Sequence, residues 1–224
     1  MLIDPPAAVV FLFDVDNTLL DNDRFRADLD AWLTRHLGAD QCQRYARIYD
    51  ERRQRLGYAD YLGSIQALRA GLEHDPALPE LSRFVLDYPF TDLFHPGAPG
   101  VLAELAGPCA IVSDGDIVFQ PHKIRRSGLW DAVDGRVMVC LHKQDAIRAI
   151  EERYPARHYV MVDDKVELLA DMKRAMGERL STVFVRQGHY AAAADPAIQP
   201  PPDHAIEHIG QLADIDFRQT AAAT

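Results

Sequence analysis

The sequence predicts an α/β protein: a parallel sheet with helices on both faces, into which an all-helical segment is inserted. Short runs of β-branched and aromatic residues alternate with longer amphipathic stretches, which is typical of strands joined by crossover helices. These runs are apolar at nearly every position, as expected when helices cover both faces of a sheet. The alternation breaks once, because residues 23–88 contain no convincing strand.

The first strand is expected over residues 9–13, where an apolar run ends abruptly in Asp14, Asp16 and then Thr18. Carboxylates at the end of a buried strand cost free energy unless a cation or hydrogen bonds compensate their charge. This short segment therefore predicts a central strand and a charged site at its end.

The inserted segment has the periodicity of amphipathic helices. Phe25, Leu29 and Leu33 fall on one helix face. Helices are expected to be interrupted at Gly38, Gly57 and Pro89. Further helices are expected over residues 41–55, 58–72 and 78–86. We therefore predict an α/β core formed by residues 1–19 and 90–224, and an all-helical insertion formed by residues 20–89, with the return hinge over 94–99.

The rest of the chain resumes the alternation. Four further strands are expected over residues 109–112, 136–141, 158–162 and 182–185, and helices over 100–106, 117–127, 144–153 and 166–176. Such an order implies parallel pairing through right-handed crossovers, and thus a Rossmann-like core. The tail after Gln187 gives weaker signals, with loops expected over 191–194 and 199–203 and a short helix over 206–212.

Polar residues follow these strands where each one ends. Ser113 ends the second strand, Lys143 opens the helix after the third, and an acid pair ends the fourth. Because the carboxyl ends of parallel strands share one edge of the sheet, we expect these groups to converge. The predicted site consists of Asp14, Asp16, Ser113, Lys143, Asp163 and Asp164.

Clustered carboxylates repel, so one would take up a proton unless a cation lay among them. Mg²⁺ suits such a site, because it accepts a few carboxylates and keeps water and phosphate oxygens as its other ligands. Lys143 adds a positive charge and Ser113 a hydroxyl, so the set predicts a site for a phosphoryl group.

In these motifs the chain resembles the haloacid dehalogenase-like (HAD) hydrolases. The segment Asp14-Val15-Asp16-Asn17-Thr18, then Ser113, Lys143 and Asp163-Asp164, is similar to the four motifs of that family in their order. The resemblance extends from Val9 to about Gly188, includes the helix after the second motif (Gln120, Lys123, Gly128 and Leu129), and includes a helical cap between the first two motifs.

The resemblance implies a role for each residue. Asp14 would be the nucleophile, and Asp16 the acid and then the base. Ser113 would bind the phosphoryl oxygens, and Lys143 would orient and neutralise Asp14. The residue after Lys143 is Gln144, where many members have proline, and Lys123 is a competing lysine.

The resemblance also implies the metal ligands. Asp14 and Asp163 would bind Mg²⁺ directly, and Asp164 directly or through water. The backbone carbonyl of Val15 or Asp16 would complete the site.

Taken singly, these residues have simpler explanations. The segment after the first strand could be a plain turn, and the acid pair could cap the next helix. A lysine at a helix start, however, opposes the helix dipole. In the insertion, Arg52, Arg53 and Arg55 could meet an anionic substrate or form a solvated face.

Composition narrows the class of protein. The net charge of −10 argues against a nucleic acid or an anionic membrane as partner. Three cysteines form no disulfide framework, residues 1–6 lack the features of a signal peptide, and no apolar run is long enough to span a membrane. We expect a cytoplasmic protein.

The sequence thus predicts an Mg²⁺-dependent phosphomonoester hydrolase that acts on a small phosphorylated metabolite through an aspartyl-phosphate. A haloacid dehalogenase is an alternative, but it needs no Mg²⁺ and typically lacks the second acid, here Asp16. A phosphomutase stays open. A receiver-like signalling domain would carry its acid pair early, and a non-catalytic binding protein would lack an acid or the lysine. The sequence specifies neither the metabolite nor the oligomeric state.

Overall fold

The computed structural model describes residues 6–105 and 107–217. In this part of the chain a single sheet has the order β3-β2-β1-β4-β5-β6, and every neighbouring pair is parallel. The strands are β1 (Ala7–Phe13), β2 (Cys109–Asp114), β3 (Val137–Cys140), β4 (Ala156–Asp163), β5 (Leu180–Val185) and β6 (His204–Ile206). The predicted α/β fold with a Rossmann-like core is confirmed, and β1 lies at its centre.

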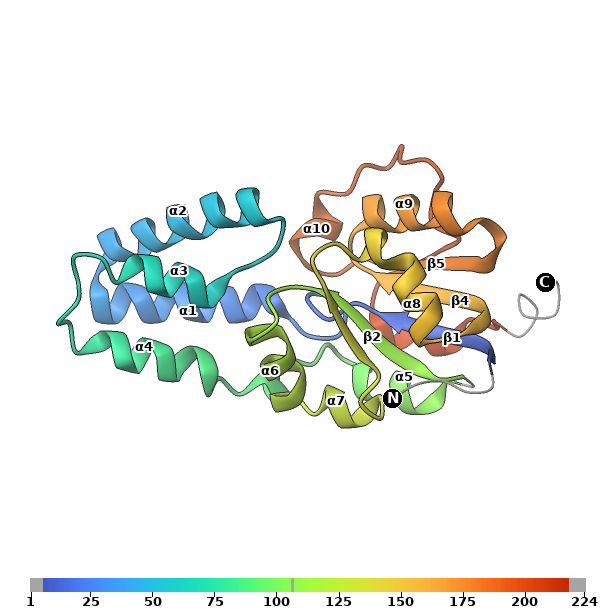
Figure 1. Ribbon diagram of the computed structural model, residues 1–224, viewed down its shortest axis with the longest axis horizontal. Helices are drawn as coiled ribbons and strands as arrows, with labels where there is room; N and C mark the ends of the chain where they lie inside the picture. Colours follow the sequence, from blue (N-terminus) through green and yellow to red (C-terminus); the bar gives the residue numbers. More distant parts are fainter. Residues whose placement is uncertain (1–5, 106, 218–224) are drawn as a thin grey trace.

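Alternate residues of β1 face opposite layers of helices. Val10 and Leu12 belong to one apolar cluster, with side chains of α8 (Ile147–Arg153) and α9 (Val166–Met176). Phe11 and Phe13 belong to the other, with side chains of α5 (Ala98–Glu104), α6 (Phe119–Arg126) and α7 (Leu129–Ala132). Figure 1 shows α9 on one side of the sheet and α5 and α7 on the other. Both faces are covered, which explains why the strands are apolar throughout.

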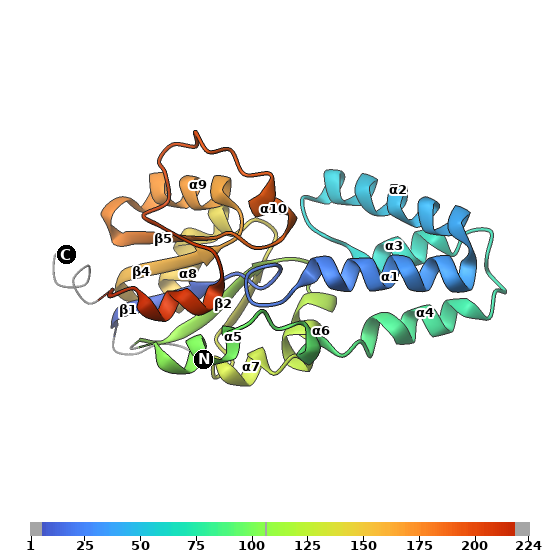
Figure 2. The ribbon, with the colours of Figure 1, turned by 180° about the vertical axis from the view of Figure 1, so that it is seen from behind.

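Four of the helices between β1 and β2 form what we call the helical subdomain. They are α1 (Asn22–Leu37), α2 (Ala39–Leu56), α3 (Tyr61–Leu68) and α4 (Ala77–Leu86), followed by the 3-10 turn η1 (Phe90–Leu93). Within residues 22–93, all of which the structure describes, no residue belongs to a strand of the sheet. Figures 1 and 2 show α1 to α4 projecting together to one side of the sheet.

Aromatic rings join the helical subdomain to the core. Phe25 of α1 packs against Tyr61 and Tyr88, with ring centroids 5.2 and 4.9 Å apart. Phe119, at the start of α6, lies 5.9 Å from Phe25 and 5.3 Å from Tyr61. This apolar junction holds the base of the subdomain beside the carboxyl edge of the sheet.

The structure differs from the sequence prediction mainly in short elements. The helix expected over 58–72 is shorter, because Asp60 caps its start by accepting a hydrogen bond from the Gly63 N–H at 2.8 Å, and turns follow Leu68. The helix expected over 144–153 begins as a 3-10 turn, η2 (Lys143–Ala146). Residue 106, the end of the helix expected over 100–106, and residues 1–5 lie outside the described residues.

The tail contains more structure than predicted. The loop expected over 191–194 is partly the helix α10 (Gly188–Ala192), and the helix expected over 206–212 is the 3-10 turn η4 (Ile209–Asp214). The strand β6 was missed, because its three residues carry no apolar run and are ordered by pairing with β5. Among the described residues, no helix combines the length and the apolarity needed to cross a bilayer.

Candidate active site

The carboxyl edge of the sheet brings the predicted residues together. Asp14 follows β1, and Asp163 ends β4 beside it. Lys143 comes from the turn after β3, where its backbone N–H donates to Asp114 Oδ1 at 2.8 Å. Its side chain is completely buried, and Nζ donates to Asp14 Oδ1 and, at 2.7 Å, to Asp163 Oδ2. Three strand ends therefore meet at one ammonium group.

Asp14, Asp163 and Asp164 form a buried acid cluster, in which one carboxylate oxygen of each residue lies within 4.8 Å of the others. Neither carboxylate oxygen of Asp164 has a hydrogen-bond partner among the described residues. Burial, and then the charges of Asp163 and Asp14, raise the pKa of Asp164 to about 9. The three acids therefore cannot all be ionised at neutral pH without a further cation.

Lys143 compensates only part of this charge. Burial alone would lower the pKa of Lys143, but Asp14 and Asp163 raise it above the ordinary value, so the ammonium stays charged. Burial also raises the pKa of Asp163, despite the opposing effect of Lys143. One ammonium among three acids leaves an excess of negative charge, and a set of carboxylate oxygens suits a hard divalent ion.

Asp16 lies apart from the acid cluster. Its carboxylate accepts a hydrogen bond from Nζ of Lys123, whose side chain is buried. The same Nζ lies 3.4 Å from Asn22 Oδ1, at the start of α1. The two lysines thus form ion pairs with different acids: Lys143 pairs with Asp14, and Lys123 pairs with Asp16. The Asp16 carboxylate is therefore paired with a lysine that does not contact the acid cluster.

Ser113 is buried at the end of β2, and its Oγ accepts a hydrogen bond from Gln120 Nε2 at 2.9 Å. Since the oxygen is engaged as an acceptor, its own O–H is left to donate toward the cavity. Gly115 makes this arrangement possible, because a Cβ there would lie 2.9 Å from Cβ of Gln120.

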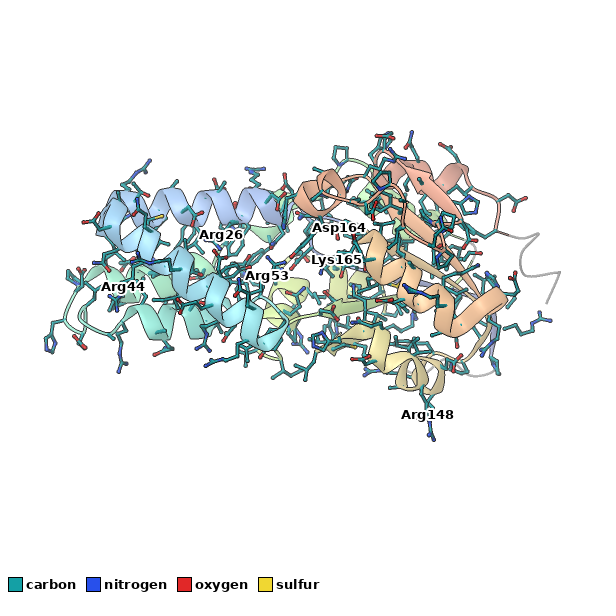
Figure 3. All side chains as sticks on the ribbon, turned by 90° about the horizontal axis from the view of Figure 1, so that it is seen from above. Arg26, Arg44, Arg53, Arg148, Asp164 and Lys165 are labelled. Atoms are coloured by element: carbon teal, nitrogen blue, oxygen red, sulfur yellow. The ribbon has the colours of Figure 1, made fainter. Side chains whose placement is uncertain are left out.

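A cavity of about 80 Å³ lies between the core and the helical subdomain. Asp14, Asp16 and Ser113 line it from the core, whereas Tyr49 and Arg53 line it from α2. Figure 3 shows Arg53 at the end of the subdomain nearest the core, on the side of Asp164 and Lys165, and Arg44 at the far end. The cavity is therefore lined by acidic groups on the core side and by aromatic and cationic groups on the side of the helical subdomain.

The three arginines considered together in the sequence lie in different surroundings. Arg52 donates from Nε to Asp60 at 3.0 Å within the subdomain, and Arg55 is exposed. Of these three, only Arg53 lines the cavity.

Sequence reasoning missed several residues that line the cavity: Asn17, Asn22, Asp114, Lys165, His189 and Tyr190. Asp114 and Lys165 had a signal, since each neighbours a predicted site residue. Asn17 has a positive φ of 62°, and its Oδ1 accepts the N–H groups of Asn22 and Asp23 at 3.0 and 3.1 Å. Tyr190 lies in a tail whose pattern gave no indication of a site.

A family model described as haloacid dehalogenase-like hydrolase matches residues 9–177. A crystal structure of a haloacid dehalogenase-like hydrolase from Burkholderia xenovorans LB400 is 52% identical, with a TM-score of 0.87, and the match covers 94% of this chain and 97% of that one. No curated protein matches.

More distant structures share the fold. The HAD-hydrolase YfnB from Bacillus subtilis, bound to magnesium, has 17% identity and a TM-score of 0.61, over 93% of this chain and 98% of that one. The L-2-haloacid dehalogenase from Xanthobacter autotrophicus, with chloropropionic acid covalently bound, has 21% identity and a TM-score of 0.61, over 92% and 96%.

Proposed function

Because the chain belongs to the haloacid dehalogenase-like hydrolases, we propose that it is an Mg²⁺-dependent phosphomonoester hydrolase acting on a small phosphorylated metabolite. The observation that carries this proposal is the buried acid cluster with the two unpartnered oxygens of Asp164. Such a cluster suits a divalent cation, and a divalent cation suits phosphoryl transfer more than dehalogenation.

Asp14, Asp163 and Asp164 would hold the metal, together with the backbone carbonyl of Val15 or Asp16. Both oxygens of Asp163 already accept hydrogen bonds, from Lys143 Nζ at 2.7 Å and from the Lys165 N–H at 2.9 Å. No described residue donates a hydrogen bond to either oxygen of Asp164, so we take Asp164 as a direct ligand, one of the two possibilities that the resemblance left open for it. When bound, Mg²⁺ supplies charge stabilisation to the phosphoryl oxygens.

Asp14 is the proposed nucleophile. Lys143 holds its Oδ1, so Oδ2 is left to form a bond to phosphorus while the bond from phosphorus to the ester oxygen breaks. Lys143 and the Ser113 hydroxyl stabilise the charge on the transferring group.

Asp16 is the proposed acid–base residue. It gives a proton to the leaving alkoxide, then takes one from the water that attacks the aspartyl-phosphate and releases inorganic phosphate. Lys123 holds this carboxylate at the cavity wall.

The helical subdomain is the proposed cap, formed by residues 20–89 on a core of 1–19 and 90–224. A Cβ at Gly57 would lie 2.2 Å from Cε1 of His142, so α2 ends directly against the core. Opening at this contact would admit substrate, and closing would exclude bulk water. The magnesium-bound structure of YfnB is described as revealing interdomain movement, which agrees with such a motion.

The test measures two products side by side. With Mg²⁺, the protein is expected to release inorganic phosphate from p-nitrophenyl phosphate, and excess EDTA should stop the release. The alternative haloacid dehalogenase would release chloride from 2-chloropropionate in EDTA, and a phosphomutase would pass the phosphoryl group to a second metabolite. Chloride release without phosphate release would overturn the proposal. Location in the cytoplasm and the absence of nucleic-acid and membrane partners stay predictions.

A further inference from the structure

Arg53 is a half-buried cation without an anionic partner. Residues 22–93 contain three other half-buried arginines, and each has a partner: Arg26 bonds Asp30, Arg44 bonds the Ala70 carbonyl, and Arg52 bonds Asp60. No described residue accepts a hydrogen bond from the Arg53 guanidinium, which lines the same cavity as Asp14 and Ser113. Partial burial of a guanidinium costs free energy unless a hydrogen-bond acceptor contacts it. For Arg53, the space open to such an acceptor is the cavity.

The ring of Tyr190 lies against this guanidinium. Its Cζ lies 5.1 Å from the centroid of Tyr190, and Lys165 Nζ lies 4.9 Å from the same ring. Arg53 also acts on Tyr49, whose pKa is raised by burial and lowered by the nearby guanidinium. The cation–π contact with Tyr190 orients Arg53 without using its N–H donors. The donors are therefore preorganised and free.

The phosphoryl machinery does not use Arg53. Lys143, Ser113 and the acid cluster all lie on the core side, whereas Arg53 comes from α2 on the opposite wall (Figure 3). The cavity volume of about 80 Å³ is far below the roughly 300–1,000 Å³ of sites for drug-sized ligands. A second anion at Arg53 must therefore be small and close to the phosphoryl group.

We propose that Arg53 binds a carboxylate of the substrate, and that the substrate is a short phosphate ester with a carboxylate at its other end. A guanidinium fork matches a carboxylate with two parallel hydrogen bonds, and a carboxylate is smaller than a second phosphate. The inference rests on the proposed function, because it places the carboxylate opposite a phosphoryl group. It makes Arg53 the residue that selects among phosphate esters.

Binding of two non-hydrolysable phosphonates tests this without turnover. The full chain with Mg²⁺ is titrated calorimetrically with 3-phosphonopropionate, and with propylphosphonate, which carries a methyl group in place of the carboxylate. The wild type is expected to bind the carboxylated ligand about 10- to 100-fold more tightly, as for a charged hydrogen bond. In Arg53→Gln the ratio of the two affinities should fall to near unity. Arg55→Gln, an exposed neighbour on α2, is the matched control and should keep the wild-type ratio.

Arg53→Lys is the second variant and keeps the charge if Arg53→Gln fails to fold. It should retain part of the preference, because an ammonium lacks the fork. Equal binding of both ligands by the wild type, weakening of both ligands by the same factor in Arg53→Gln, or no binding of either ligand would overturn the inference. An Arg53-dependent preference in a protein that hydrolyses no phosphate ester would support the subsite and refute only the proposed function.

Discussion

Replacing Asp164 with asparagine is expected to stabilise the metal-free protein while removing its response to Mg²⁺. Asp164 is completely buried, its oxygens lack partners, and Asp163 and Asp14 lie beside it. Asparagine has nearly the same shape and does not ionise, so it keeps the packing and removes the free-energy cost of holding a proton on Asp164 in the folded protein. The proposed metal ligand Asp164 is thus expected to destabilise the protein when the metal is absent.

The magnitude follows from the pKa. The pKa of Asp164 is raised to about 9 in the folded protein, against about 3.9 for an aspartate in an unfolded chain. At pH 7 the folded protein therefore keeps a proton on Asp164 about three pH units above the pKa of the unfolded chain. This costs at most roughly 4 kcal/mol of folding free energy. We expect Asp164→Asn to gain about 2–4 kcal/mol, equivalent to roughly 4–16 °C in Tm.

The pH dependence has a definite sign. Below about pH 4 both states carry the proton, so wild type and variant should have similar stability. As the pH rises toward 9, the unfolded chain loses the proton while the folded protein keeps it, so the wild type becomes progressively less stable than the variant. The difference in the free energy of unfolding should therefore widen from acid to alkaline pH.

Thermal unfolding in EDTA, followed by circular dichroism at pH 5, 7 and 8.5, measures this difference. Asp145→Asn is the matched control, because Asp145 is exposed, and it should leave Tm unchanged. A lower Tm for Asp164→Asn at pH 7, or a difference that does not vary with pH, would refute the reasoning about the acid cluster.

Three further predictions concern the same site. Asp14→Asn should fold normally and hydrolyse p-nitrophenyl phosphate no faster than background, because an amide is a very poor nucleophile; near-normal rates would exclude a covalent role. Asp16→Asn should lower kcat about 10²–10⁴-fold and leave buried Lys123 without its anion, which a combined kinetic and unfolding measurement detects. Mg²⁺ at 100 times its Kd should stabilise the wild type by about 2.7 kcal/mol, or roughly 5–11 °C in Tm, and an unchanged Tm would contradict metal binding at the cluster.

The sequence was most informative where a strand is buried on both faces. The central strands are apolar throughout and end in polar residues, so both the strands and the edge they share could be predicted. β6 could not, since its residues are ordered only by pairing with β5. Helix boundaries in the tail depended in the same way on contacts that are distant in sequence.

The site was predicted from the core better than from the helical subdomain. Strand ends place Asp14 and Asp163 next to each other whatever the details of packing. On α2, in contrast, successive residues turn by about 100°, so the rotation of the helix decides which arginine enters the cavity. That rotation is set by packing, for example Arg52 against Asp60, and not by a local pattern. The pairing of Lys123 with Asp16 is likewise a tertiary contact.

Trapping the phosphorylated enzyme tests the central claim most directly. The protein is mixed with Mg²⁺ and p-nitrophenyl phosphate, quenched in acid during turnover, digested, and examined by mass spectrometry, with Asp14→Asn treated in parallel. The account predicts one added phosphoryl group on the peptide that contains Asp14, absent from Asp14→Asn. Turnover with the phosphoryl group on another residue, or with no phosphorylated peptide and full activity in Asp14→Asn, would contradict it.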